Sequence, residues 1–229
     1  MDGHRMALRL RTHWIIWSGL VVFISIGAII SSLSSKRTIS SIELTPGASV
    51  SIQLFRPFPD LIGLSMEFER PKGHKRPELG QSGHNKDWKQ IGFIDYQNPG
   101  VPIKLLVRSE GKEGVYEATP AWAYGNAILR TLLPFIDDGN PSRFQWPPEQ
   151  RLRLGLPAGY SDLVISVQDV GVKLRGERVN IIVEPPISFK FVPNGPYYYV
   201  WLFILWPVYA LPVLLYGIAL LWCSIRKSP

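Results

Sequence analysis

Two histidines and two nearby carboxylates are the residues of this sequence whose types could bind a metal. His74 and His84 fall with Glu78 and Asp87 in one stretch, residues 69–89, which is rich in glycine and basic residues. Catalytic zinc takes three protein ligands, normally held on rigid elements. A glycine-rich stretch is a poor rigid support, so the sequence predicts solvated surface histidines, no bound metal and no cofactor.

A nucleophile paired with a base is also missing from the sequence. Hydrolases that use a nucleophilic side chain need an activated serine or cysteine beside a histidine. The sequence has no Gly-x-Ser-x-Gly turn, and none of its predicted strands carries a histidine. The single cysteine, Cys223, lies at the end of an apolar segment without a paired base, and it excludes an intrachain disulfide.

Paired carboxylates are the remaining route to catalysis. Asp137 with Asp138, or Glu43 with Glu67, could flank a glycosidic bond. The run Asp-Asp-Gly-Asn is more typical of a turn, which could at most bind calcium weakly. We therefore predict no catalytic residues and a protein that is not an enzyme.

Two long uncharged segments, residues 14–35 and 197–225, must position whatever lies between them. Each exceeds the roughly 20 residues that a helix needs to cross a bilayer, and aromatic residues mark their ends. Pro207 and Pro212 predict a bend in the second segment. A cleaved signal peptide, with residues 32–34 as the cleavage site, is the alternative for the first.

The charge distribution predicts orientation rather than nucleic-acid binding. The net charge is +7, and the two tails, residues 1–13 and 226–229, supply +4 of it from five basic residues and one acid. Basic flanks stay in the cytoplasm. Both termini are therefore predicted on the cytoplasmic side of a bacterial inner membrane, and the central domain in the periplasm. The basic residues of the tails are Arg5, Arg9, Arg11, Arg226 and Lys227.

The central segment, residues 36–196, reads as one β-rich domain. Apolar and polar residues alternate in several short runs that are separated by Gly, Pro and Asn, which is the strand signature. Helical spacing competes at residues 120–133 alone. About eight or nine strands are expected, and the predicted architecture is an antiparallel β-sandwich, jelly-roll or immunoglobulin-like. One run is Val101, Ile103, Leu105 and Val107.

Two long polar or aromatic stretches, residues 69–89 and 133–150, are the candidate recognition loops. Stretches of this length in compact domains tend to be functional or mobile. Their aromatic residues either cap an open end of the sandwich or contact a protein, a glycan or the membrane interface. The predicted partner-binding residues are Trp88, Trp122, Phe135, Phe144 and Trp146.

Three functions remain open from the sequence. The leading prediction is a non-enzymatic two-pass membrane protein whose periplasmic domain binds or scaffolds another membrane or periplasmic protein. The second is an immunity-type protein that neutralises a toxin acting in the periplasm. The third is a carbohydrate-binding or carbohydrate-active domain that stacks sugars on Trp88, Trp122 or Trp146.

Overall fold

The computed structural model describes residues 2–57, 59–69, 76–81, 93–96, 98–124, 127–136, 143–145, 152–185 and 205–226. The chain divides into two compact units. One unit consists of Met1–Ser35 with Ile187–Pro229, and the other is Lys36–Pro186. Each unit is described separately.

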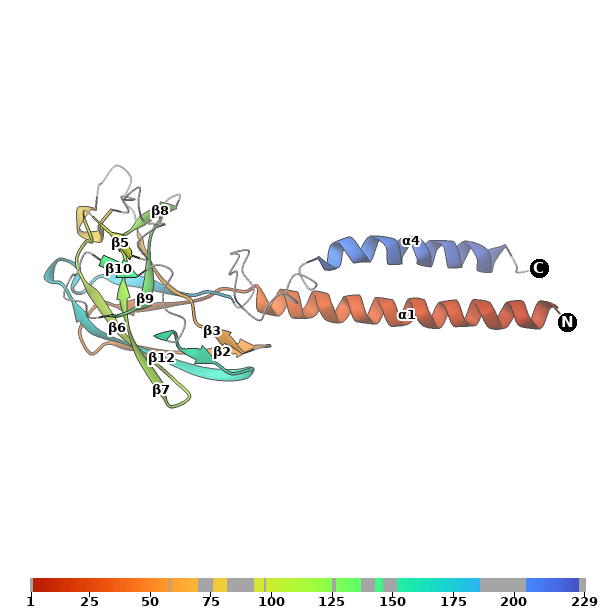
Figure 1. The fold of residues 1–229 in the computed structure, drawn as a ribbon, viewed down its shortest axis with the longest axis horizontal. Helices are drawn as coiled ribbons and strands as arrows, with labels where there is room; N and C mark the ends of the chain where they lie inside the picture. Colours follow the sequence, from red (N-terminus) through yellow and green to blue (C-terminus); the bar gives the residue numbers. More distant parts are fainter. Residues whose placement is uncertain are drawn as a thin grey trace. The chain divides into compact units, whose positions relative to one another are not determined.

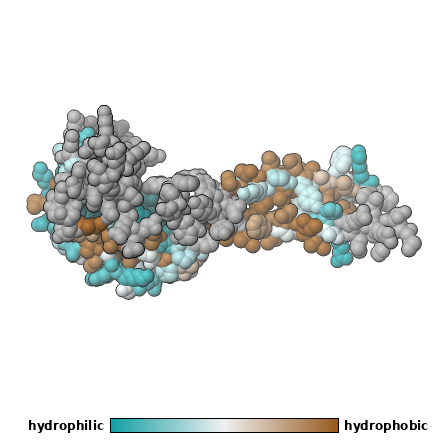
Figure 2. Space-filling view, viewed as in Figure 1, coloured by the Kyte–Doolittle hydropathy of each residue, from teal (hydrophilic) through white to brown (hydrophobic). Residues whose placement is uncertain are grey.

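The first unit contains two helices, α1 (Asp2–Ser34) and α4 (Trp206–Ile225) (Figure 1). Within them, Leu10–Leu33 and Trp206–Ile225 are long and apolar enough to cross a membrane, and Figure 2 shows their largely hydrophobic surface. Helix α1 begins upstream of the predicted segment. Pro207 lies in the first turn of α4, where proline is tolerated, so Pro212 is the one proline inside this helix.

Specific side-chain contacts join the two helices. Trp17 Nε1 donates a hydrogen bond of 2.8 Å to the carbonyl oxygen of Val213. His13 Nδ1 and the Tyr216 hydroxyl share a hydrogen bond of 2.7 Å. A Cβ atom added to Gly217 would lie 2.5 Å from Trp17 Nε1, so this glycine makes room for the indole. Small residues that admit a close neighbour are typical of helix pairs in membranes.

Replacing Trp17 with alanine should loosen this pair, because it removes the indole that fills the space over Gly217 together with its hydrogen bond. The measurement is cross-linking by a short bismaleimide between His13→Cys and Tyr216→Cys, in a Cys223→Ser background. We expect Trp17→Ala to slow the cross-link. Trp222→Ala is the matched control, since Trp222 is 60% exposed on α4. Equal cross-linking rates in both variants would contradict the prediction.

The second unit is built on one antiparallel sheet. Its strand order is β1-β13-β4-β9-β7-β6-β12-β2, and β8 (Trp122–Tyr124) pairs with β9. The two end strands, β1 and β2, lie beside each other, so the sheet is nearly closed into a barrel. The eight strands of the order are β1 (Thr38–Glu43), β2 (Ser49–Arg56), β4 (Leu64–Glu69), β6 (Ile103–Ser109), β7 (Lys112–Ala118), β9 (Ala127–Pro134), β12 (Gly159–Val170) and β13 (Arg178–Val183).

Smaller elements complete the barrel unit. Strand β3 (Asp60–Leu61) pairs with β11 (Gly155–Leu156), and β5 (Phe93–Asp95) pairs with β10 (Arg143–Gln145). Two short 3₁₀ helices, η1 (Pro77–Leu79) and η3 (Val172–Leu174), lie between strands.

The prediction of a mainly-β, antiparallel domain between two apolar helices is confirmed. A sandwich of two separate sheets is not confirmed, because the main strands belong to one continuous sheet. The helical reading of residues 120–133 is wrong. This segment contains β8 and β9, and Ile128, Arg130 and Leu132 are buried at every second position of β9.

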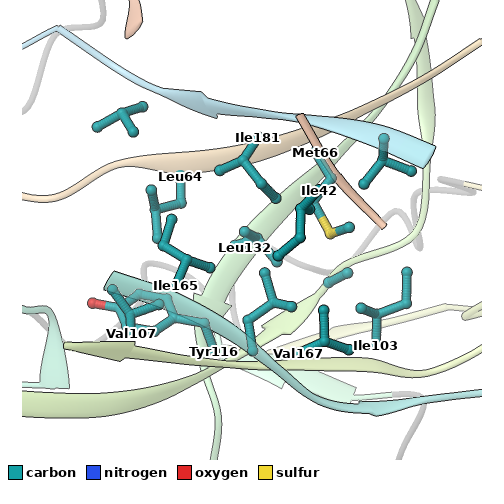
Figure 3. Packing of buried hydrophobic residues seen from close by; sticks show 14 of the residues in the cluster. Ile42, Leu64, Met66, Ile103, Val107, Tyr116, Leu132, Ile165, Val167 and Ile181 are labelled. Atoms are coloured by element: carbon teal, nitrogen blue, oxygen red, sulfur yellow. The ribbon is translucent and has the colours of Figure 1, made fainter. Parts of the chain in front are cut away.

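The core fills the inside of the barrel. Inward-facing residues from all eight main strands belong to one buried cluster, which accounts for the alternation in the sequence. Figure 3 shows side chains of this cluster pointing toward one another. The labelled residues are Ile42, Leu64, Met66, Ile103, Val107, Tyr116, Leu132, Ile165, Val167 and Ile181.

Candidate functional site

The two ends of the barrel are chemically different. The end where β1 begins at Thr38 and β13 ends at Val183 is called the linker end, because the chain leads from there toward α1 and α4. The opposite end, where β1 ends at Glu43 and β13 begins at Arg178, is called the capped end.

Two short helices close the capped end. Leu79 from η1 and Leu174 from η3 reach the core and are fully buried. The carbonyl oxygen of Glu78 accepts a hydrogen bond of 2.7 Å from the Val101 amide, and that of Leu79 accepts one of 3.1 Å from the Ala121 amide. Backbone bonds therefore hold η1 against the turn before β6 and the segment before β8.

Arg76 ties η1 to the segment before β13. Its Nε lies 2.7 Å from Glu78 Oε1, and its two terminal nitrogens each donate a hydrogen bond of 2.7 Å to Glu177. The bond to Glu177 is the main reason that the pKa of Arg76 is raised above its usual value. Two parallel hydrogen bonds between an arginine and a carboxylate fix the relative orientation of the two side chains and also strengthen their attraction. The capped end is therefore a rigid part of the barrel.

Arg130 is a buried cation beneath the same end. It is 1% exposed, and its guanidinium donates to backbone carbonyls of two segments, the turn before β6 and the end of β7. Burial lowers the pKa of Arg130 to about 10. The acceptors are Thr119 at 2.8 Å, Val101 at 2.7 Å, Ala118 at 2.7 Å and Pro99 at 3.4 Å. This arrangement uses most of the guanidinium donors inside the fold, which makes Arg130 a structural residue.

The inside of the linker end is polar rather than apolar. Arg56, Ser109 and Ser161 are nearly fully buried, at inward positions on β2, β6 and β12, which are neighbouring strands. Arg56 Nη2 donates a hydrogen bond of 2.8 Å to the carbonyl oxygen of Glu184. Within the described part of the chain, Arg56 Nε and both hydroxyls have no hydrogen-bond partner. Buried polar atoms of this kind are uncommon, so three at one end mark it as chemically distinct.

Burial also changes the ionisation of the charged groups at this end. It raises the pKa of Asp60, and the nearby charge of Arg56 opposes that shift in part. It lowers the pKa of Arg56, again opposed by Asp60. The two groups therefore stabilise each other's charged forms at the edge of the core.

The outside of the linker end carries exposed apolar side chains. Phe55 on β2 faces Tyr160 on β12 across the strand pair, with ring centroids 5.0 Å apart. We call the following five residues the apolar rim: Ile39 (57% exposed), Phe55 (41%), Ile136 (40%), Leu152 (44%) and Tyr160 (72%). On the described part of the barrel, the one other large hydrophobic residue with comparable exposure is Val172, which lies in η3 at the capped end.

The predicted partner-binding aromatics do not share one environment. Trp122 lies in β8, where its backbone pairs with that of Leu129. Phe135 is half-buried, and the Lys104 ammonium lies 3.7 Å from its ring centroid. Trp88 and Trp146 lie outside the described residues.

Phe144 is 8% exposed, which leaves its ring little surface for a partner in this structure. It packs edge-on against Tyr96, with ring centroids 5.4 Å apart. The ring therefore contributes to packing beside the β5–β10 pair.

The catalytic candidates have local partners where they are described. Glu43 accepts a hydrogen bond of 2.9 Å from the Thr45 hydroxyl, and Glu67 accepts one of 3.3 Å from the Asn180 amide. Among the described residues there is no group of three or more potential metal ligands. Asp137, Asp138, His74, His84 and Asp87 lie outside them.

Sequence reasoning missed both arginines inside the barrel and the apolar rim. Arg56 and Arg130 lie at inward-facing positions of strands in which buried and exposed residues alternate. That position is the signal that could have identified them.

Comparison with known proteins identifies no family, because no family model and no curated protein matches this chain. The chain is similar to a solved crystal structure of a protein from Sulfurospirillum deleyianum, with 14% identity and a TM-score of 0.41 over 67% of this chain and 99% of that one.

Proposed function

We propose that this chain is a non-enzymatic two-pass protein of a bacterial inner membrane, with both termini in the cytoplasm. Its periplasmic barrel binds or scaffolds a membrane or periplasmic protein. The two apolar helices supply the anchor, and the basic residues of both tails supply the orientation. The contacts of Trp17 support a helix pair that stays together in lipid.

The packed interior of the barrel is the observation that carries the proposal. Side chains from every main strand fill it, as in other small barrels, so a partner would be bound by the outer surface. A rigid capped end also suits a scaffold, because Arg76 and Arg130 hold its loops in fixed positions. Binding surfaces supported in this way lose little entropy when a partner docks.

We also propose that the barrel is a jelly roll, the finer of the sequence-based fold predictions. The strand order divides into two groups of four, β1-β13-β4-β9 and β7-β6-β12-β2. The connections β1–β2, β2–β4, β4–β6, β7–β9, β9–β12 and β12–β13 each pass from one group to the other, and only the β6–β7 hairpin stays within one group of these eight strands. This alternation is the pattern of two linked Greek keys.

The test is photo-cross-linking in the intact membrane. A photoreactive amino acid replaces Phe135, which is half-buried beside Lys104 on the barrel. We expect one discrete protein to be cross-linked and to co-purify with the chain in a fixed ratio in mild detergent. The control carries the same photoreactive residue at Lys112, at the exposed tip of the β6–β7 hairpin. A chain that purifies alone, with no cross-link at either position, would overturn the proposal.

A further inference from the structure

We infer that the apolar rim lies in the lipid headgroup region of the same membrane that α1 and α4 cross. This inference rests on the proposed membrane anchoring. It adds a lipid-binding surface to a domain that is otherwise joined to the membrane by its two chain connections alone.

The distribution of exposed hydrophobic residues is the first argument. Single exposed hydrophobic residues are normal on soluble domains, whereas a group at one end marks an interaction surface. The five rim residues gather at the linker end of the described barrel, and Val172 alone marks the other end. Phe55 and Tyr160 are direct cross-strand partners, and Ile39 belongs to β1, which lies beside β2.

The chemistry of the rim is the second argument, because it suits a lipid interface better than a buried protein contact. Tyr160 combines a ring with a polar hydroxyl at 72% exposure, and its ring contacts Phe55. Tyrosine and other amphipathic aromatics prefer the boundary between headgroups and acyl chains. Aliphatic neighbours at the same level can enter the outer acyl region.

The length of the chain connection is the third argument. Ser35–Arg37 are the whole segment between the end of α1 and the start of β1. Four Cα-to-Cα steps extend at most about 14 Å, so β1 must begin close to the point where α1 leaves the membrane. Lys36 and Arg37 in this segment can reach lipid phosphates with their long side chains. The rim is therefore held near lipid by the covalent chain itself.

The experiment places one fluorescent label at a time on the full-length chain in lipid vesicles. Cys223 is the sole cysteine, so Cys223→Ser gives a background without thiols. Tyr160→Cys and Leu152→Cys carry an environment-sensitive label on the rim. Val172→Cys is the matched control, since it is an exposed hydrophobic position (80%) at the capped end. Val22→Cys, within α1, reports whether the helix is in the bilayer.

Phosphatidylcholine–phosphatidylglycerol vesicles are prepared without brominated lipids, with lipids brominated near the headgroup for the labels on the barrel, and with lipids brominated near the ends of the acyl chains for the label at 22, which lies at the middle of the span Leu10–Leu33. We expect the labels at 160 and 152 to emit at shorter wavelength than the label at 172. We also expect both to lose emission to the brominated lipids while the label at 172 keeps its emission.

The outcomes separate this inference from the function on which it rests. If the label at 22 is quenched and the labels at 160 and 152 behave like the one at 172, the anchor holds and the rim inference is wrong. Blue-shifted rim labels that lipids do not quench would assign the rim to a protein contact and overturn the inference. If the label at 22 is not quenched, the membrane anchoring itself fails.

Discussion

Replacing Arg130 with methionine is expected to lower the free energy of unfolding of the barrel by about 3–5 kcal/mol. The guanidinium donates to carbonyl oxygens of four residues, and methionine can donate to none of them. A buried carbonyl left without a partner costs about 1–3 kcal/mol. Removing the charge also ends the cost of burying it, which offsets part of the loss. The loss dominates because three of the bonds are 2.8 Å or shorter.

The measurement is urea unfolding of the full-length chain in mild detergent, followed by near-ultraviolet circular dichroism. Arg108→Met is the matched control, because Arg108 and its partner Glu113 have side chains 56% and 63% exposed. Exposed pairs contribute about 0–1 kcal/mol, so this variant should unfold almost like the parent. Arg130→Lys should lose most of the same stability, because one ammonium cannot reproduce a planar fork of donors. Parent-like stability of Arg130→Met would contradict the structural role.

Replacing Gly100 with alanine is expected to cost more than about 2 kcal/mol, for steric and conformational reasons together. Gly100 has φ of +76°, and an added Cβ would lie 2.6 Å from the Gly80 nitrogen and from the Leu79 carbonyl carbon. Both are backbone atoms, so neither can rotate away. Alanine at position 100 would push apart the turn that contains Gly100 and the turn that contains Gly80, and it would displace Leu79 from the core.

Gly111 supplies the control, since its φ of +72° is similar and an added Cβ would meet nothing within 4 Å. Gly111→Ala should therefore show the conformational cost alone, about 1–2 kcal/mol. Both variants are compared by thermal unfolding of the full-length chain. Equal melting temperatures for the two would show that the contact between the turns contributes nothing.

The alternation of apolar and polar residues identified most of the barrel strands because side chains fill the interior of the barrel. A packed interior requires an apolar residue at every second position, as in Val101 to Val107 and in β13. Strand β1 (TISSIE) escaped notice because two of its inward positions are polar, Thr38 and Ser40, and just one of its residues, Ile42, is buried. Pairing between strands far apart in sequence leaves no local signal, so the sequence predicts the strands but not that they form one continuous, nearly closed sheet.

The candidate site was less predictable than the fold. Phe144 was selected as a binding residue for its aromatic ring, but composition does not tell whether a ring faces solvent or Tyr96. The rim residues went unnoticed for the opposite reason, since Phe55 and Tyr160 read as ordinary strand residues until their outward position is known. Arg130 would be expected on the surface from its charge, whereas the carbonyls around it belong to the turn before β6 and to the end of β7, which are distant from it in sequence.

Because the barrel begins and ends on adjacent antiparallel strands, it could be inserted as one unit into another protein. Thr38 and Val183 are direct partners, so the two ends of the domain are about 5 Å apart at their Cα atoms. A domain with such ends can replace a surface loop in a host protein without forcing the flanking segments apart. The same geometry would allow this barrel to be grafted between other helix pairs, or permuted by joining these two strands and opening the chain at the tip of the β6–β7 hairpin.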